Sequence, residues 1–420
     1  MSQASQIRLF TWLHLSDLHL AENDRSKWDD LFQETYSAIN LLHQKTGPWH
    51  AIFFSGDLVF GGKKGEFDEF SLWYQDFLNQ LDSSVAALPL VVVPGNHDVH
   101  RRVFDPADHY DATTQLFFGA FGLHGIDWER YMVDFCNNTT HEVRVMASDI
   151  FKNYAVWWQN SNETAISRSR MTSGVVPGDG TFTITGDGVT LGLVCMNTSV
   201  LDSIGSKQAE VVFGQKPPDQ RLYWHHDQVV AAADGDLDGW ARQFDVAFLM
   251  THHDPTFLRQ SANATSCHVR GNGRFTLHLC GHTHKGRLLG DIADPNLTRW
   301  IAESLRGYAN AITNSTGATV SNWSSRWLGF AVGQIEIHVN GPNRDIFLRR
   351  WSQNALSVEE NPPGKDRHIS QFVSATPASA SGCYSTYLGN GSILSFESFT
   401  KSWEDATIRS LAGHILGGMP

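Results

Sequence analysis

Five short polar segments each follow an apolar run rich in β-branched or aromatic residues, which is typical of side chains placed where strands end. The apolar runs cover residues 12–15, 52–54, 91–93, 246–250 and 275–279. The polar segments are Asp17-Leu18-His19, Gly56-Asp57, Gly95-Asn96-His97-Asp98, His252-His253 and Gly281-His282-Thr283-His284. Carboxylate, imidazole and amide groups are ligands that hold hard or borderline divalent ions. Together the segments predict a site for two metal ions.

The spacing inside the segments supports this interpretation. Asp17 and His19 are two residues apart, and residues with that spacing share one face of an extended chain, so both can reach one ion. His282 and His284 can each serve a metal in the same way if the chain is extended there. Asp57 ends the second strand, and its two carboxylate oxygens allow it to bridge two ions.

In this order the segments read D-x-H, G-D, G-N-H-[DE], H and G-H-x-H, and the chain resembles the calcineurin-like metallophosphoesterase superfamily. The match is closest to a bacterial branch that reads W-L-H-L-S-D-L-H and V-P-G-N-H-D-V, here residues 12–19 and 93–99. The resemblance covers residues 8–351 and does not include the tail. It implies an α/β fold of the αββα type, in which two mixed β-sheets are flanked by helices.

The resemblance also implies a dinuclear centre in which Asp57 bridges the two ions. The first ion would take Asp17, His19 and His284 in addition, and the second would take Asn96, His252 and His282. Manganese is the favoured ion, and iron, zinc or cobalt would suit the same ligands. Two ions can clamp the attacking and leaving oxygens at phosphorus, and a hydroxide that bridges them would attack directly.

Four further residues are candidates for catalysis or substrate binding. In the family, the histidine of G-N-H-D, here His97, stabilises phosphoryl charge or protonates the leaving oxygen, and Asp98 would orient its imidazole. The alternative is that His97 is a structural turn residue. Arg101 suits a substrate phosphate, although an ordinary surface position fits it equally. Asn197 matches an N-[ST] position near the site in the family.

One segment departs from the family pattern, because His-His-Pro is replaced by His252-His253-Asp254-Pro255. An alignment of residues 251–258 on the related form H-H-P-L-D-W-L makes His252 the ligand. An alignment on the displaced proline favours His253 instead. We favour His252.

Between the segments, apolar spacing predicts alternating strands and helices, and βαβαβ order implies parallel strands with the site at their carboxyl ends. The first part has predicted strands at 8–15, 52–54 and 90–93 and helices at 27–43 and 66–81. The later part has hairpins at 181–185 with 189–196 and at 330–339 with 345–351, a helix at 218–233 and a strand at 245–250.

We expect a metallophosphoesterase domain over residues 1–351, and a linker with a C-terminal tail of unknown role over 352–420. Irregularly spaced aromatic residues within 103–181 indicate either a cap over the site or a helical insertion on the sheet edge. The tail has a candidate helix that begins near Ser402. It could attach the chain to a partner or form an oligomer.

Composition limits the partners and the compartment. A net charge of −12 disfavours tight wrapping of nucleic acid by the whole surface. The five cysteines are scattered, which argues against a disulfide framework. No apolar leader and no run of membrane-spanning length is visible, so the expected location is the cytoplasm, without a membrane partner.

The leading hypothesis is a metal-dependent hydrolase of phosphate esters, preferably a phosphodiesterase or nuclease acting on a cyclic nucleotide, a nucleotide or a nucleic-acid diester. One alternative is a phosphomonoesterase, including a protein phosphatase. Another is a non-catalytic binding module with the same fold. Degenerate relatives of that kind lose metal ligands, whereas this chain keeps every one, so turnover is the expected property.

Overall fold

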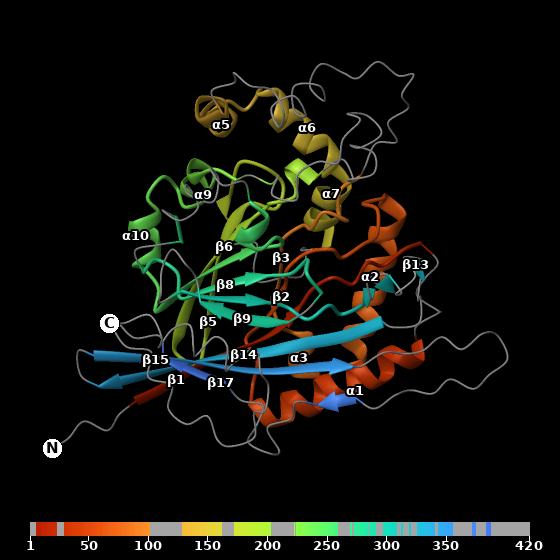
Figure 1. Ribbon diagram of the computed structural model, residues 1–420. Helices are drawn as coiled ribbons and strands as arrows, with labels where there is room; N and C mark the ends of the chain where they lie inside the picture. The colour runs from red at the N-terminus through yellow and green to blue at the C-terminus, as the bar shows by residue number, and fades with distance from the viewer. Residues whose placement is uncertain are drawn as a thin grey trace.

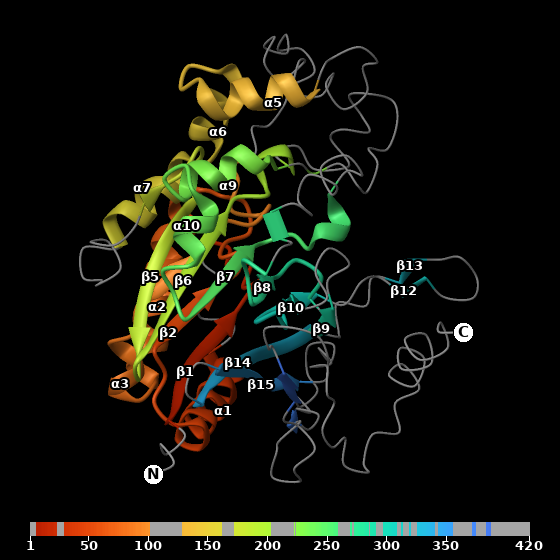
Figure 2. The ribbon, with the colours of Figure 1, turned by 90° about the vertical axis from the view of Figure 1, so that its left-hand side faces the viewer.

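The computed structural model describes residues 6–22, 29–100, 128–161, 172–202, 222, 224–258, 269–270, 273–284, 286–290, 297–308, 312–313, 319–320, 326–340, 343–355, 372–374 and 384–387. Within these residues two large β-sheets pack face to face, and helices lie on their outer sides (Figures 1 and 2). The predicted αββα sandwich is therefore confirmed.

The first sheet joins the N-terminal strands to a long C-terminal hairpin. Its strands, in spatial order, are β16 (Phe372–Ser374), β15 (Asn343–Ala355), β14 (Arg326–Asn340), β1 (Gln6–Leu15), β2 (Ala51–Phe54) and β3 (Leu90–Val92). Two more strands, β11 (Gly307–Tyr308) and β17 (Tyr384–Tyr387), pair with β14 and β15. β1, β2 and β3 are parallel neighbours as predicted, and β14 pairs antiparallel with β1.

The second sheet combines an antiparallel hairpin with a parallel core. Its order is β4 (Thr172–Ser173), β5 (Gly180–Gly186), β6 (Val189–Met196), β7 (Val246–Thr251), β8 (Leu277–Cys280), β10 (Thr298–Ile301) and β9 (Arg287–Gly290). β6, β7, β8 and β10 run parallel, so their carboxyl ends meet at one edge. A separate small pair is formed by β12 (Ile312–Thr313) and β13 (Thr319–Val320).

The helices cover the outer faces of the sheets and one end of the molecule. They are α1 (Asp29–Thr46), α2 (Lys64–Gln80), α3 (Ser83–Ala86), α5 (Trp128–Asn137), α6 (Glu142–Ile150), α7 (Lys152–Ser161), α9 (His226–Ala232) and α10 (Leu237–Ala241), with 3-10 turns η4 (Val200–Asp202) and η5 (Pro255–Phe257). The predicted helix at 218–233 starts too early, because α9 begins only at His226. The His225 side chain caps it there by accepting from the Asp227 N–H.

Aromatic side chains fill the space between the sheets. Trp12 of β1 lies 5.1 Å from Phe248 of β7 and 5.7 Å from Trp300 of β10, measured between ring centroids. All three rings are fully buried. On β14, a Cβ at Gly333 would overlap the Trp12 indole, so the absence of a side chain there makes room for the ring. This packing holds the two sheets against each other.

Three helices from the predicted cap region lie in the described part of the chain. α7 packs on α2, where Trp157 stacks on Phe67 with ring centroids 5.7 Å apart, and Tyr154 donates to the Val92 carbonyl of β3. α5 and α6 lie beyond α7 and α9 at one end of the molecule, at the top of Figures 1 and 2. For α7 this packing favours the helical-insertion alternative. The flanking stretches, 101–127 and 162–171, lie outside the described residues.

Part of the segment expected to be linker and tail belongs to the first sheet. β15 continues to Ala355, and β16 and β17 both pair antiparallel with it. The candidate helix near Ser402 lies outside the described residues. Among the described helices, none is long and apolar enough to cross a membrane.

The candidate metal centre

The five polar segments come together where strands of both sheets end. The residues that follow these strands are Asp17 after β1, Asp57 after β2, Asn96 after β3, His252 after β7 and His282 after β8. The Gly281 N–H donates to the His252 carbonyl, and the Asp17 N–H donates to the Gly56 carbonyl, so neighbouring segments are joined directly. The candidate site therefore lies at the carboxyl ends of parallel strands.

One group of candidate ligand atoms comes from Asp17, His19 and His284. The His19 and His284 Nε2 atoms lie 3.1 Å apart. Asp17 Oδ1 lies 3.4 Å from His284 Nε2 and 3.9 Å from His19 Nε2. Two atoms about 2.1 Å from one ion and about 90–110° apart are roughly 3.0–3.4 Å from each other. The two distances to His284 Nε2 fall in this range, and the distance between Asp17 and His19 is longer, so a shared ion would need a wider angle there.

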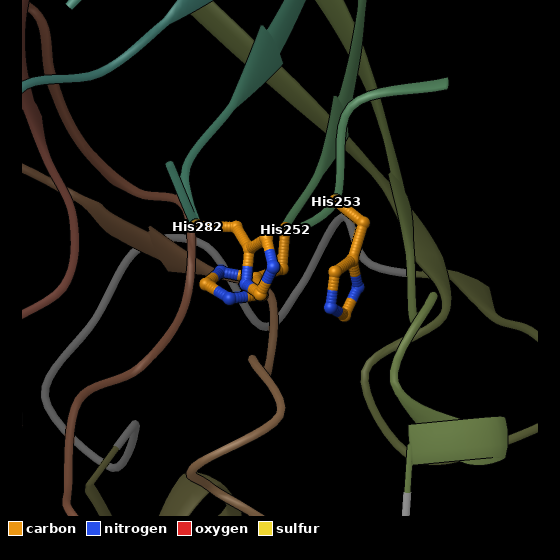
Figure 3. Close-up of side chains that lie close together, drawn as sticks. All are labelled: His252, His253 and His282. Atoms are coloured by element: carbon orange, nitrogen blue, oxygen red, sulfur yellow. The ribbon is translucent and has the colours of Figure 1, made fainter. Parts of the chain in front are cut away.

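A second group comes from Asn96, His252 and His282. Asn96 Oδ1 lies 3.1 Å from both His252 Nε2 and His282 Nδ1. The Asp57 carboxylate lies between the two groups: its Oδ2 is 3.2 Å from His252 Nε2, and ligand atoms of Asp17, Asp57 and His252 all lie within 4.8 Å of one another. Figure 3 shows His252 and His282 close together with His253 beside them.

The donor set fits two divalent ions. Asp17 and Asp57 are buried, with 0% and 1% of their surface exposed, and buried carboxylates are costly without compensating positive charge. Around them are imidazole nitrogens and one amide oxygen at the distances that a coordination shell requires. The structure thus brings together all seven residues for which the sequence predicts a metal-binding role.

Backbone groups orient two of these side chains. The His252 Nδ1–H donates to the Ser55 carbonyl at 2.7 Å, and because a carbonyl only accepts, Nε2 is left as the ligand atom. The His97 N–H donates to Asp57 Oδ1 at 2.7 Å, which leaves Oδ2 beside His252 Nε2. A Cβ on Gly56 would overlap the His252 imidazole, so this position has no room for a side chain.

The backbone of the ligand segments is left-handed, not extended as we expected. Five of the seven candidate ligands have positive φ, namely Asp17 (55°), His19 (51°), Asp57 (57°), His282 (68°) and His284 (61°). Asp and His tolerate this region better than most residues, although it remains unfavourable. The side chains two residues apart therefore converge because the chain curls after each strand, and a shared strand face is the wrong explanation.

The two adjacent histidines after β7 have different surroundings. His252 Nε2 lies among candidate ligands, whereas His253 Nδ1 is hydrogen-bonded to Thr198 Oγ1 at 2.9 Å. The Thr198 hydroxyl oxygen also accepts from the His253 N–H at 3.2 Å. A ring nitrogen of His253 still lies within 4.8 Å of those of His252 and His282 (Figure 3). These contacts favour His252 as the ligand.

A pair of alanine variants tests this choice. We expect His252→Ala to lose metal on dialysis, because its Nε2 is within 3.2 Å of two other ligand atoms. The matched variant His253→Ala should keep two ions per chain. Elemental analysis of both proteins after dialysis decides the matter. Metal loss in His253→Ala with retention in His252→Ala would move the ligand to position 253.

His97 lies at the edge of the centre. One of its ring nitrogens is within 4.8 Å of ligand atoms of His19 and Asp57. Its Nδ1–H donates to the Phe60 carbonyl at 2.8 Å, so Nε2 is the nitrogen that remains for a substrate.

The expected role of Asp98 needs correction. Its carboxylate oxygens accept from the Gly95 and Val59 N–H groups at 2.8 and 3.0 Å, and thereby hold the turn. Phe60, and not Asp98, orients the His97 imidazole. Burial, reinforced by the nearby Asp57 charge, raises the pKa of Asp98.

Of the two candidate substrate-binding residues, only Asn197 lies in the part of the chain that the structure describes. Arg101 lies outside the described residues. Asn197 is buried, its amide donates to the Pro177 carbonyl, and its side-chain oxygen accepts from the Ser199 N–H, both at 2.8 Å. These contacts support a role in holding the turn after β6 and do not point toward a substrate.

The ionisation of the ligands follows from burial and the two carboxylates. Burial lowers the pKa of His19 to about 3, and burial together with the His252 charge lowers the pKa of His282 to about 4. Burial also opposes a charge on His252, but Asp57 and Asp17 outweigh it and raise its pKa to about 9. At neutral pH the metal-free protein therefore carries a proton on His252. Burial also opposes a charge on His284, but Asp17 outweighs it and raises the pKa of that histidine as well.

The proton on His252 predicts the pH dependence of metal binding. A histidine must be neutral to bind a metal, so loading should release a proton from His252 at pH 7, and apparent affinity should rise with pH toward about 9. Calorimetric titration with Mn²⁺ in buffers of different ionisation enthalpy measures the proton count. Binding that is independent of pH between 6 and 9 would contradict the protonation of His252.

Several supporting residues carry no sequence signal. Ser55 and Phe60 act through backbone carbonyls, which every residue possesses. The Ser304 hydroxyl, on the loop after β10, donates to the Asp17 carbonyl at 3.0 Å, from almost three hundred residues away in sequence. Thr198 could have been suspected, because it completes the N-[ST] pair that begins at Asn197.

Solved structures resemble the chain only weakly. A dimetal phosphatase from Danio rerio is 12% identical with a TM-score of 0.35, over 88% of this chain and 99% of that one. An NAD nucleotidase from Haemophilus influenzae is 10% identical with a TM-score of 0.34, over 87% of this chain and 54% of that one. A 5′-nucleotidase from Candida albicans is 10% identical with a TM-score of 0.34, over 79% of this chain and 52% of that one. Scores this low carry no argument about function.

The family model gives a direct result. No curated protein matches this chain. The sequence model of the protein family described as calcineurin-like phosphoesterase matches residues 10–286. This range is more than half of the sequence and includes every candidate ligand. The chain belongs to the calcineurin-like phosphoesterase family of metal-dependent phosphoesterases.

Proposed function

We propose that this protein is a phosphodiesterase that works with two divalent metal ions, of which manganese is the favoured one. One observation carries the proposal. Two groups of candidate ligand atoms lie side by side, and the Asp57 carboxylate lies within 4.8 Å of a ligand atom of Asp17 in the first group and 3.2 Å from His252 Nε2 in the second. This arrangement matches what two-metal phosphoryl transfer needs, and a binding module would have no use for it.

The flanks of the centre support a diester. The Phe60 side chain lies beside His97, and Phe257 lies edge-on to His282 with ring centroids 4.7 Å apart. Both rings are at least partly exposed. A diester carries one negative charge and an organic group on each side of phosphorus, whereas a monoester approaches two charges at neutral pH. Apolar side chains beside His97 and His282 suit the diester better.

The roles of the residues follow from their positions. When bound, the metal ions supply Lewis acidity to the phosphoryl oxygens and lower the pKa of water. Asp57 would help to hold both ions, and its Oδ1 is fixed by the His97 N–H. The His97 ring, with its Nδ1–H held by the Phe60 carbonyl, can act as an acid in its doubly protonated form: it would pass the Nε2 proton to the oxygen that leaves phosphorus and become neutral. Water supplies the new oxygen, and the bond to the leaving oxygen breaks.

A turnover panel tests the proposal. With Mn²⁺ supplied, the protein should hydrolyse aryl diesters, cyclic nucleotides or short single-stranded DNA with higher kcat/KM than aryl monoesters or duplex DNA. The net charge of −12 is the reason to expect little action on long duplexes. Asp57→Asn, purified in parallel, controls for a contaminating phosphatase.

Three results would contradict parts of this proposal. A far higher kcat/KM for an aryl monoester would make the protein a monoesterase, which is the alternative within the family. A far higher kcat/KM for duplex DNA would require a basic channel that composition does not indicate. Metal-loaded protein without turnover on any ester would leave a binding module with the same fold.

A further inference from the structure

Phe60 differs from the other exposed apolar residues of the described chain. Its side chain is 49% exposed, and the remaining large exposed side chains of this kind are all aliphatic: Ile7, Leu41, Leu72, Val133, Val145 and Val156. Single exposed apolar residues are ordinary on protein surfaces and need no explanation by themselves. The position of Phe60 beside the candidate catalytic histidine is what calls for one.

Three rings form a row from the buried centre to the surface. The His19 ring is 3% exposed and its centroid lies 4.6 Å from that of His97. The His97 centroid in turn lies 5.5 Å from that of Phe60. Phe60 is therefore an exposed ring within reach of a group that is bound beside His97.

The loop that carries Phe60 is held in place by hydrogen bonds that do not involve the ring. The Phe60 N–H donates to the Leu20 carbonyl at 3.1 Å, and the Phe60 carbonyl accepts from the His97 imidazole. The next residue, Gly61, donates its N–H to the carboxylate of the buried Glu66 at 2.9 Å. Because the loop backbone is fixed in this way, only the side-chain torsions of Phe60 need to be ordered when a flat ligand binds.

We propose that Phe60 is a stacking platform for a nucleobase carried by the leaving group, which makes nucleotide diesters the preferred substrate class. This proposal rests on the proposed function, since it assigns a leaving group to the same centre. A nucleobase is separated from its phosphate by one sugar. The His97 and Phe60 ring centroids are 5.5 Å apart, so a phosphate beside His97 would leave the base near Phe60. Stacking of a base on an aromatic side chain is tolerant of base identity, so the preference should extend over several bases.

The test uses two methyl phosphodiesters that differ only in the base. One is the diester of a nucleoside 5′-phosphate, and the other has a tetrahydrofuran sugar without a base. Their leaving sugar oxygens have similar basicity, so the chemistry at phosphorus is matched. Chromatography of the products identifies cleavage on the sugar side. The parent protein should prefer the nucleoside ester by roughly 5- to 100-fold in kcat/KM.

Three variants separate the ring from the loop. Phe60→Leu keeps the backbone hydrogen bonds and removes the aromatic ring, and it should lower the preference for the base at least about 5-fold. Phe60→Trp should keep or increase the preference. Leu72→Ala, at a side chain of similar exposure on α2, should leave it unchanged. Metal content and thermal melting of each variant show that the fold and the centre are intact.

The outcomes distinguish this inference from the proposed function. Equal losses for both esters in Phe60→Leu, or no preference in the parent, would overturn the stacking role while leaving the phosphodiesterase in place. Absence of turnover on every ester would overturn the proposed function. In that case calorimetry tests the stacking role of Phe60. It measures the ratio of the affinity for a nucleoside 5′-monophosphate to the affinity for the sugar phosphate without a base, in the parent protein and in Phe60→Leu. A ratio that Phe60→Leu does not change would refute it.

Discussion

Asp57→Asn is expected to release both metal ions and to abolish turnover. The Asp57 Oδ1 accepts from the His97 N–H, and an amide can keep this bond only if its single oxygen occupies that place. The amide NH₂ group would then lie where Oδ2 now lies, 3.2 Å from His252 Nε2, and it cannot bind a metal. Loss of the negative charge weakens both ions further. We expect affinity to fall at least about 100-fold, beyond the range for groups that only support a ligand.

The measurement is metal content after dialysis, accompanied by turnover of an aryl diester. Asp179→Asn is the matched control, because Asp179 is also buried but accepts from the Asn197 N–H and the Gln228 amide, away from the ligand groups. This control should keep two ions per chain. Two ions retained in Asp57→Asn would show that Asp57 does not bridge them.

The fold and the gathering of the site were predictable from sequence because residue type and order specify them. Apolar runs predict the strands, and parallel βαβ order brings the segments after β1, β2 and β3 to one edge. The second sheet contributes His252 and His282 from the ends of β7 and β8, also parallel. The candidate segments thus follow from their position at strand ends, without knowledge of any side-chain angle, and the assignment of ligands to each ion is what the resemblance implies.

The local geometry could not be predicted, because it depends on contacts that residue types do not encode. The left-handed backbone at Asp17 and His19 is held by hydrogen bonds to segments distant in sequence, such as that from the His19 N–H to the Asp57 carbonyl at 3.0 Å. The carbonyl of Phe60 orients His97 although the adjacent Asp98 has the more suggestive side chain. Backbone acceptors are alike in every residue, so sequence cannot single one out.

The predicted cap illustrates a different limit. Trp157 belongs to a set of aromatic residues that could equally face a substrate or a helix, since both surfaces are apolar. In the structure its ring packs against Phe67 and Phe70 of α2, with its Nε1–H donating to the Ser71 hydroxyl. Composition alone predicts that these aromatic residues are buried. Only the tertiary arrangement decides whether a substrate or a neighbouring helix covers them.

His97→Ala is expected to keep both metal ions and to lose turnover by roughly 10²–10⁴-fold, the range for a positioned acid–base group. The imidazole is held by the Phe60 carbonyl at 2.8 Å, and its backbone N–H, which the variant retains, still supports Asp57. Removal of the ring should therefore leave the ligand geometry in place. His100→Ala, at an exposed residue of the same loop, is the control for loss of a nearby histidine and should retain two ions and full turnover.

The dependence on leaving group decides what the ring contributes. A diester that releases an acidic phenol departs without a proton, so its hydrolysis should fall least in His97→Ala. A diester that releases an alkoxide should fall most, because the His97 Nε2 proton is then needed at the leaving oxygen. Equal losses for both leaving groups would instead indicate stabilisation of charge at phosphorus. Loss of an ion would show that His97 itself is a ligand, which its distance of less than 4.8 Å from ligand atoms of His19 and Asp57 permits.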